Sequence, residues 1–149
     1  MVQVEDDRLT LRIARPYAEA IGIAVFAFAR LEWTAVQCCQ ALEPGSIEAL
    51  SDRTAGRVAD TLKHLARSLP ESPRRARLLE QADAFQAYTR TRNNLLHARP
   101  GTDAAGDACL YRDGDAWTLS ELHAVANAFV ACGTRLEALL AELPLIQPD

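Results

Sequence analysis

The chain has little of the chemistry that metal sites need. Its 149 residues include only three histidines and four cysteines, and no two cysteines form a Cys-x-x-Cys pair. These counts argue against a zinc site, so we expect no metal and no cofactor. Free thiols buried in helices, in a reducing cytosol, are the expected state of the cysteines, although no role is assigned to Cys38, Cys39, Cys109 or Cys132.

Lysine is almost absent, and the positive charge is nearly all arginine. Lys63 is the only lysine, and the formal net charge is −4. A molecule with this charge does not attract nucleic acid over long distances, so any RNA binding must come from a local patch. The arginines Arg74, Arg75 and Arg77 form one cluster, which is either such a patch or a tolerated surface feature.

Familiar catalytic signatures are also missing. The sequence has no G-x-S-x-G, no glycine-rich phosphate loop, no His-Glu-x-x-His and no recognisable DNA-reading helix-turn-helix. These absences argue against the best-known hydrolase, nucleotide-binding and zinc-protease classes.

No hydrophobic run is long enough to predict a membrane span. The apolar run from Ala20 to Ala29 is bounded by Glu19 and Arg30 and is too short to cross a bilayer. The first seven residues are acidic, unlike the basic start of a signal peptide. We therefore expect a soluble cytoplasmic protein with no membrane partner.

What the sequence does contain is apolar content at a helical period. The apolar fraction is 49%, and glycine and proline are few, which favours one helical domain over residues 1–149. Helices are predicted over 16–42, from Ser46 or Ser51 to about 68, over 73–97 and from Thr118 to about 143, with Ser72 and Thr118 as caps. Residues 1–15 fit either extended chain or an early helical turn.

One stretch breaks the helical pattern. Residues 109–112 and 116–119 are β-prone and flank Asp113-Gly114-Asp115, a turn signal typical of a hairpin. The fold class is therefore all-α: a four- to five-helix up-and-down bundle with a short β-hairpin between the last two long helices. Tyr111 and Trp117 either stack on a base or cover the end of the bundle.

The most informative stretch runs from Arg90 to Gly101 and closes the third long helix. It holds an arginine, a polar residue and a histidine within two turns, at Arg92, Asn93 and His97. A guanidinium offers a fixed fork of donors to phosphate oxygens, and an imidazole exchanges protons near neutral pH. Together they indicate metal-independent chemistry on a phosphodiester.

The segment Arg92-Asn93-Asn94-Leu95-Leu96-His97 resembles the signature of the HEPN family: an arginine, a polar residue, and a histidine after four to six residues. The resemblance implies a small helical bundle, commonly a homodimer, that acts as a ribonuclease in toxin–antitoxin or phage-defence systems. Some HEPN toxins carry a tyrosine two residues after the histidine. Arg99 stands there, so regulation through that tyrosine is not implied.

Helix geometry places the two key side chains apart. Arg92 and His97 point about 140° apart on an ideal helix. Arg90, Asn93, Asn94 and His97 share one face, whereas Arg92 falls on the apolar stripe. Arg92 must then pair with an acid, reach water along its stem, or face a cleft between subunits. Glu32 is a candidate partner or a solvated carboxylate, and His97 is a catalytic group or a cap of the last turn.

The interpretation is a metal-independent endoribonuclease with Arg92, His97 and Asn93 as catalytic residues at a dimer cleft. Arg90, Asn94 and Arg99 would bind substrate, and Glu32 would support them. Expected partners are the RNA substrate, a second copy, and an antitoxin or nucleotidyltransferase. The alternatives are a non-catalytic HEPN-like module that binds a nucleotide or protein partner, and a structural bundle in which Arg92 only pairs with an acid.

Overall fold

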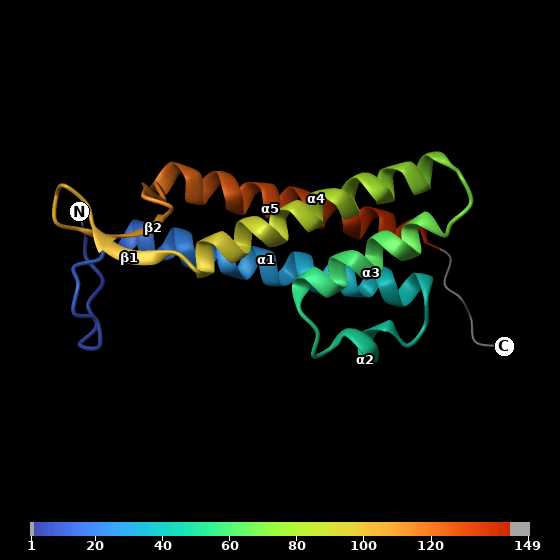
Figure 1. Ribbon diagram of the computed structural model, residues 1–149, viewed down its shortest axis with the longest axis horizontal. Helices are drawn as coiled ribbons and strands as arrows, with labels where there is room; N and C mark the ends of the chain where they lie inside the picture. The colour runs from blue at the N-terminus through green and yellow to red at the C-terminus, as the bar shows by residue number, and fades with distance from the viewer. Residues whose placement is uncertain (1, 144–149) are drawn as a thin grey trace.

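The computed structural model describes residues 2–143, and Figure 1 shows a long helical bundle with a small sheet at one end. Met1 and residues 144–149, which belong to the predicted domain 1–149, lie outside the described residues. The elements in chain order are α1 (Arg15–Leu42), α2 (Ser46–Leu50), α3 (Ala55–Arg67), α4 (Pro73–Leu96), β1 (Arg99–Thr102), β2 (Ala108–Arg112), β3 (Asp115–Ala116) and α5 (Leu119–Glu142). The largely helical fold class is confirmed.

The long helices begin and end close to the predicted positions. α1 carries a proline in its first turn, and α4 begins at Pro73 after Ser72, whose hydroxyl accepts the N–H of Arg75 at 3.1 Å. Before α5, Thr118 and Glu121 form the predicted capping box in both directions, at 3.1 and 2.9 Å. These local contacts satisfy backbone N–H groups that the helix itself leaves unpaired.

The predicted second helix is divided in two. Gly45 adopts a φ of +96°, and the short α2 follows it. α3 begins only at Ala55, because the Thr54 hydroxyl caps it by accepting the N–H of Arg57 at 3.2 Å. Neither Ser46 nor Ser51 caps the longer helix: the Ser46 hydroxyl donates to the Glu43 carbonyl at 2.7 Å.

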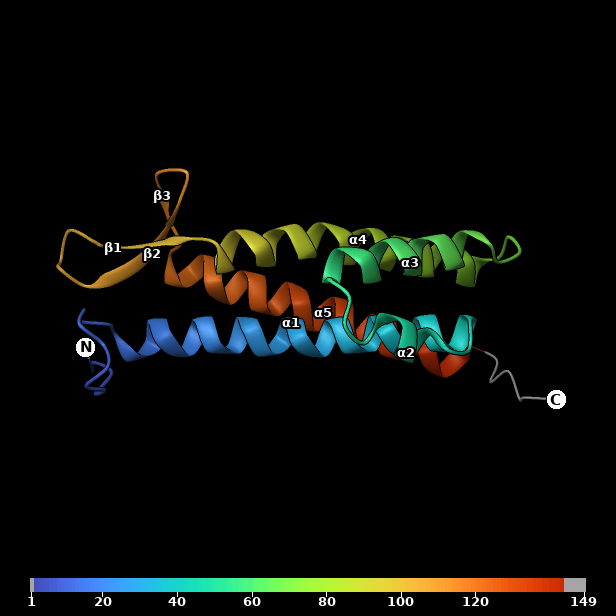
Figure 2. The same cartoon turned by 60° about the horizontal axis from the view of Figure 1, so that its bottom comes forward.

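Within residues 2–143 the helices follow an up-and-down order in which α1 and α5 are parallel. Ala20 and Ala24, early in α1, pack with Leu122 and Ala126, early in α5, so these two helices run in the same direction. The colours in Figures 1 and 2 show that α3 also runs parallel to α1, because the segment around α2 leads the chain back along α1. α4 runs against α1, α3 and α5, and the short segment that contains α2 also runs against α1, so successive helices alternate in direction.

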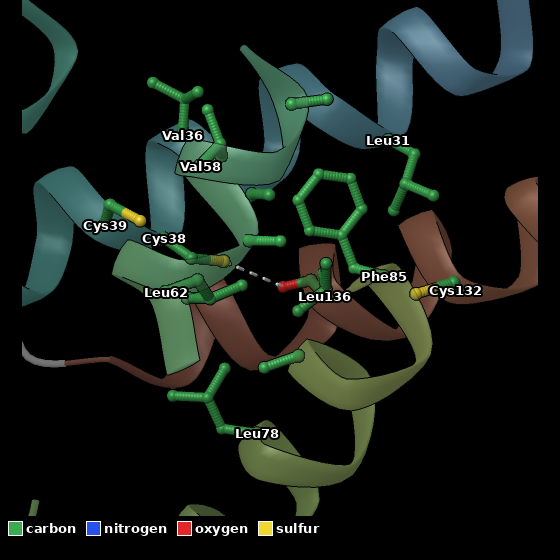
Figure 3. Close-up of a cluster of buried hydrophobic side chains, with 14 of the residues drawn as sticks. Leu31, Val36, Cys38, Cys39, Val58, Leu62, Leu78, Phe85, Cys132 and Leu136 are labelled. Atoms are coloured by element: carbon green, nitrogen blue, oxygen red, sulfur yellow. Dashed lines mark hydrogen bonds between the residues drawn. The ribbon is translucent and has the colours of Figure 1, made fainter. Parts of the chain in front are cut away.

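The main core lies where α1, α3, α4 and α5 meet. Figure 3 shows Phe85 of α4 among leucine, valine and cysteine side chains from the other three helices. Phe28 of α1 stacks on Phe85 with ring centroids 5.9 Å apart, and it meets Phe129 of α5 edge-on at 5.1 Å. A second, smaller core joins the first halves of α1 and α5 to Leu95 near the end of α4.

The segment between α4 and α5 forms three antiparallel strands in the order β1-β2-β3. The prediction of a single hairpin was therefore wrong, although Asp113 and Gly114 do turn the chain between β2 and β3 with φ of 52° and 84°. These two positive φ angles fit the hairpin turn that Asp-Gly favours. The missed strand, β1, contains Pro100 and Gly101 and is tolerated because it lies at the sheet edge.

The residues before α1 are extended rather than helical. Val4 donates its N–H to Ile13 at 2.9 Å, and Arg15 donates to Val2 at 2.8 Å, so the segment folds back on itself. Figure 1 places this segment beside the sheet. The sheet and the N-terminal segment together cover one end of the bundle.

Two helices, α1 and α5, are long and apolar enough to cross a membrane by length and composition. The core helices of a bundle meet the same criteria, and these two pack against each other through the cores described above. The pattern is therefore weak evidence for a membrane span, and the cytoplasmic location stays a prediction.

Candidate functional site around Arg92

Arg92 lies on the inner side of α4, one turn before the helix ends. Its guanidinium carbon lies 4.6 Å from the centroid of the Phe28 ring on α1. An arginine at this distance is attracted by the electrons of the ring face. The Phe28 ring packs against Phe85 and Phe129, so its position under the guanidinium is fixed by the core.

The guanidinium of Arg92 has unused hydrogen-bond donors. Its Nε atom is buried and has no hydrogen-bond partner. Among residues 2–143, no carboxylate lies within 4 Å of it as an ion pair. A buried charged donor without a partner is costly, and a bond to a ligand is one way to offset that cost.

Glu32 lies near Arg92 without bonding to it. Glu32 follows Phe28 by one helical turn on α1 and is half-buried. Burial raises the pKa of its carboxyl above the ordinary value, and the positive charge of Arg92 opposes part of that shift. The two side chains therefore feel each other electrostatically, but the direct pair that sequence reasoning left open does not form within residues 2–143.

His97 is exposed at the end of α4. It is the C-cap residue, and its backbone N–H donates to the Asn93 carbonyl at 2.9 Å. It therefore ends the helix through its backbone, whereas its imidazole makes no hydrogen bond or ion pair within the described part of the chain. The ring is free to meet a substrate or another molecule.

The remaining motif residues face outward. Arg90, Asn93 and Asn94 are exposed on α4, and Arg99 is exposed at the start of β1. Their side chains bind no other group among residues 2–143. The structure thus separates the predicted site into Arg92, turned toward α1, and an outward group on the far side of α4.

Tyr111 in β2 and Trp117 just after β3 have contacts of their own at the end of the bundle. Trp117 packs against the small core around Leu95, and the Tyr111 hydroxyl donates to the Thr102 carbonyl at 3.0 Å. The Tyr17 hydroxyl donates to the Trp117 carbonyl at 2.7 Å and accepts the Leu110 N–H at 3.0 Å. These contacts favour the second interpretation of the aromatics, a cover over the bundle end.

The arginine cluster of α4 has partners of its own. Arg74 and Arg77 lie 3.5 and 3.1 Å from Glu142 of α5, and Arg75 donates to the Arg67 carbonyl at 3.2 Å. An RNA contact surface would have to compete with these bonds. The cluster therefore serves packing between helix ends in this structure.

The sequence did not reveal the contact between the Arg92 guanidinium and the Phe28 ring. Phe28 was recognisable as part of the apolar stripe of α1, but nothing local connects it to a residue 64 positions later. The available signals were the arginine on an apolar stripe and the Phe28–Glu32 spacing on one helix face. No group of three or more His, Cys, Asp or Glu side chains among residues 2–143 could hold a metal ion.

Comparison of the chain with protein-family models, with curated proteins and with solved structures finds no significant match.

Proposed function

We propose that the protein is a metal-independent endoribonuclease of HEPN type, in which Arg92 and His97 carry the chemistry. The observation that supports this most is the guanidinium of Arg92: it lies over the ring of Phe28, and among residues 2–143 its buried Nε has no partner and no carboxylate binds it. A guanidinium held in place with its donors unused is suited to phosphate oxygens.

In the proposed reaction the ribose 2′-hydroxyl attacks the adjacent phosphorus and the 5′-oxygen leaves. His97 takes the proton of the attacking hydroxyl or returns one to the leaving oxygen, a role that typically contributes about 10²–10⁴-fold. Arg92 stabilises the charge that develops on the phosphoryl oxygens. The products carry a 2′,3′-cyclic phosphate and a 5′-hydroxyl.

The neighbouring polar residues have supporting roles in this proposal. Asn93 orients His97 or donates to the phosphate. Arg90, Asn94 and Arg99, all exposed, contact the phosphates that flank the reacting one. Glu32 lies beside Arg92 and limits how the guanidinium can turn.

The proposal includes a second subunit, and two features of the motif support it. Arg92 is turned toward α1, whereas His97 of the same chain is exposed beyond the helix end. We therefore place the reaction in a cleft where the motif faces of two copies meet and each Arg92 receives a His97 from the other copy. An antitoxin or nucleotidyltransferase partner would cover this face and block the reaction.

The test is RNA cleavage by the purified protein in EDTA, with end-group analysis of the products. Arg92→Met and His97→Ala should abolish cleavage while circular dichroism stays unchanged. His64→Ala and Arg67→Ala are matched controls, because both residues are exposed near the end of α3, which lies beside the start of α4 and not beside the motif at its end. Cleavage that persists in His97→Ala would refute the proposed role of this residue.

The separation of Arg92 from His97 also favours a second candidate, a non-catalytic module that binds a nucleotide or a protein. In that case the free guanidinium of Arg92 holds a phosphate without chemistry. Stoichiometric nucleotide binding that Arg92→Met abolishes and His97→Ala leaves intact, with no cleavage of several RNA substrates, would select this candidate.

A further inference from the structure

A second exposed surface lies on the side of α1 away from Arg92. Phe26 is 74% exposed, Ile23 is 54% exposed, and Val130 of α5 is 51% exposed. They border a shallow groove that also contains Glu19, Gly22 and Arg30. We call these six residues the α1–α5 face. Large apolar side chains exposed next to one another in this way mark interaction sites.

The α1–α5 face is separate from the proposed RNA site. Phe26 and Phe28 lie two positions apart on α1 and so point roughly 160° apart. Phe28 is turned into the bundle beneath Arg92, whereas Phe26 points outward. A partner on this face would leave Arg92 and His97 uncovered.

The charges on this face indicate what covers it. Glu19 lies at one end of the apolar strip on α1 and Arg30 at the other. The midpoint between these two charges falls between Ala24 and Val25. When two copies meet here with antiparallel α1 helices, Glu19 of each copy lies opposite Arg30 of the other. A parallel arrangement would instead place like charges together. A two-fold contact of this kind uses the same patch twice, as homodimers do.

Gly22 leaves space on the α1–α5 face that a side chain of a second copy can fill. A Cβ atom at Gly22 would meet nothing within 4 Å, so packing inside the chain does not require glycine there. Glycine inside a helix is unfavourable relative to alanine, which makes its presence informative. In the antiparallel arrangement the Phe26 ring of each copy lies over Gly22 of the other, where the missing side chain leaves room.

We propose that the α1–α5 face binds the same face of a second copy, with antiparallel α1 helices, Phe26 packed over Gly22, and Glu19 paired with Arg30 across the contact. Arg30 already holds Glu137 of its own chain at 3.0 Å, yet its side chain is 64% exposed. Its remaining N–H groups can therefore bind a second carboxylate. This interface adds to, and does not replace, any contact between motif faces.

The first test is analytical ultracentrifugation of the wild type and of Gly22→Leu over a wide concentration range. Leucine fits the open space of the single chain but fills the place of the incoming Phe26. We expect circular dichroism to be unchanged and self-association to weaken on the order of 30-fold or more, the loss typical of a central contact residue. Phe26→Ala should have the same effect. Self-association equal to wild type in both variants overturns the proposal.

The second test examines the antiparallel pairing directly. Glu19→Arg and Arg30→Glu should each associate more weakly than wild type, because each homodimer then contains two repulsive pairs. An equimolar mixture should recover association, since both cross-contacts in the mixed dimer join opposite charges. Glu48→Arg mixed with Arg57→Glu is the control, since both residues are exposed on other helices. A mixture that associates no better than its components overturns the antiparallel arrangement.

A lipid surface is the competing occupant, and the same variants distinguish it. Flotation with vesicles of phosphatidylcholine and phosphatidylglycerol should be absent for the wild type. Two results together would overturn the proposal in favour of a membrane. The wild type would bind vesicles in a way that Phe26→Ala abolishes, and it would self-associate no more strongly than Gly22→Leu.

Discussion

Arg92 combines a permanent positive charge with a position on the inner side of a helix. The ring of Phe28 stabilises the guanidinium, but the buried Nε has no acceptor in the described part of the chain. An unmet buried donor costs about 1–3 kcal/mol, whereas an arginine–aromatic contact returns only about 0.5–2 kcal/mol. Arg92 therefore contributes little to the free energy of unfolding. This is what we expect of a residue whose role is to bind a ligand.

Arg92→Met tests this balance. Methionine keeps the stem on the Phe28 ring and removes the unmet donor, so the free energy of unfolding should change by less than about 1 kcal/mol. Urea unfolding followed by circular dichroism measures the difference. A loss well above about 2 kcal/mol would identify Arg92 as a structural residue and weaken the functional proposal.

Glu32 should make stability depend on pH. Burial, the largest cause, raises the pKa of Glu32 in the folded protein above its ordinary value of 4.5. The folded state then holds this proton more tightly than the unfolded chain, so the Glu32 contribution to stability falls as the pH rises from about 4.5 through the raised pKa. Glu32→Gln should remove that fall, and its gain over wild type should be larger at pH 7 than at pH 4.

Urea unfolding at several pH values between 4 and 7 measures this effect. Glu48→Gln, at an exposed position, corrects for the general effect of removing one negative charge. If the difference between Glu32→Gln and wild type is the same at pH 4 and pH 7, the pKa of Glu32 is not raised in the folded protein.

At the scale of elements, α4 and α5 depend on the contacts at their ends. The sheet occupies the connection between them, and the Tyr17 hydroxyl ties that sheet to α1 through Leu110 and Trp117. β3 ends at Ala116, and Thr118 is the N-cap of α5, which begins at Leu119. The two reciprocal bonds of Thr118 with Glu121 cap the first turn of α5.

Thr118→Ala should lower the free energy of unfolding by about 1 kcal/mol, the usual effect of losing an N-cap hydroxyl. Chemical denaturation measures the loss, and Thr118→Ser, which keeps the hydroxyl, should restore most of it. Equal losses in the two variants would show that the threonine methyl group, rather than the cap, is responsible.

At the scale of the whole molecule, the folded protein shields its cysteine thiols from solvent. Cys38, Cys39, Cys109 and Cys132 are all buried and free. Burial raises the pKa of Cys38 and Cys39 to about 12 and that of Cys132 to about 11. A thiol in this state is neutral and inaccessible, so it reacts poorly with electrophiles.

Thiol labelling should therefore report global unfolding. At pH 8 without denaturant, dithionitrobenzoate should react with Cys38, Cys39 and Cys132 only as fast as the protein opens, whereas all four thiols should react at once in guanidinium. Mass spectrometry of the labelled peptides identifies each site. Rapid labelling of Cys38 or Cys132 under native conditions would show that the bundle opens locally along α1 and α5.

The sequence by itself determined the features that depend on neighbours in the chain. The period of apolar residues predicted α1, α4 and α5, the hydroxyls of Ser72 and Thr118 predicted where two of them start, and Asp113-Gly114 predicted a turn. Helix geometry also placed Arg92 on the inner face of α4. Each of these depends on groups a few residues apart, so the local pattern carries the information.

Only the tertiary structure decided the features that join distant parts of the chain. These are the parallel direction of α1 and α5, the third strand, and the contact of the Arg92 guanidinium with the Phe28 ring. The same apolar stripes would permit several helix orders, because hydrophobic burial has no direction of its own. Which stripe meets which is settled by how all the side chains fill one core, and that is a property of the whole molecule.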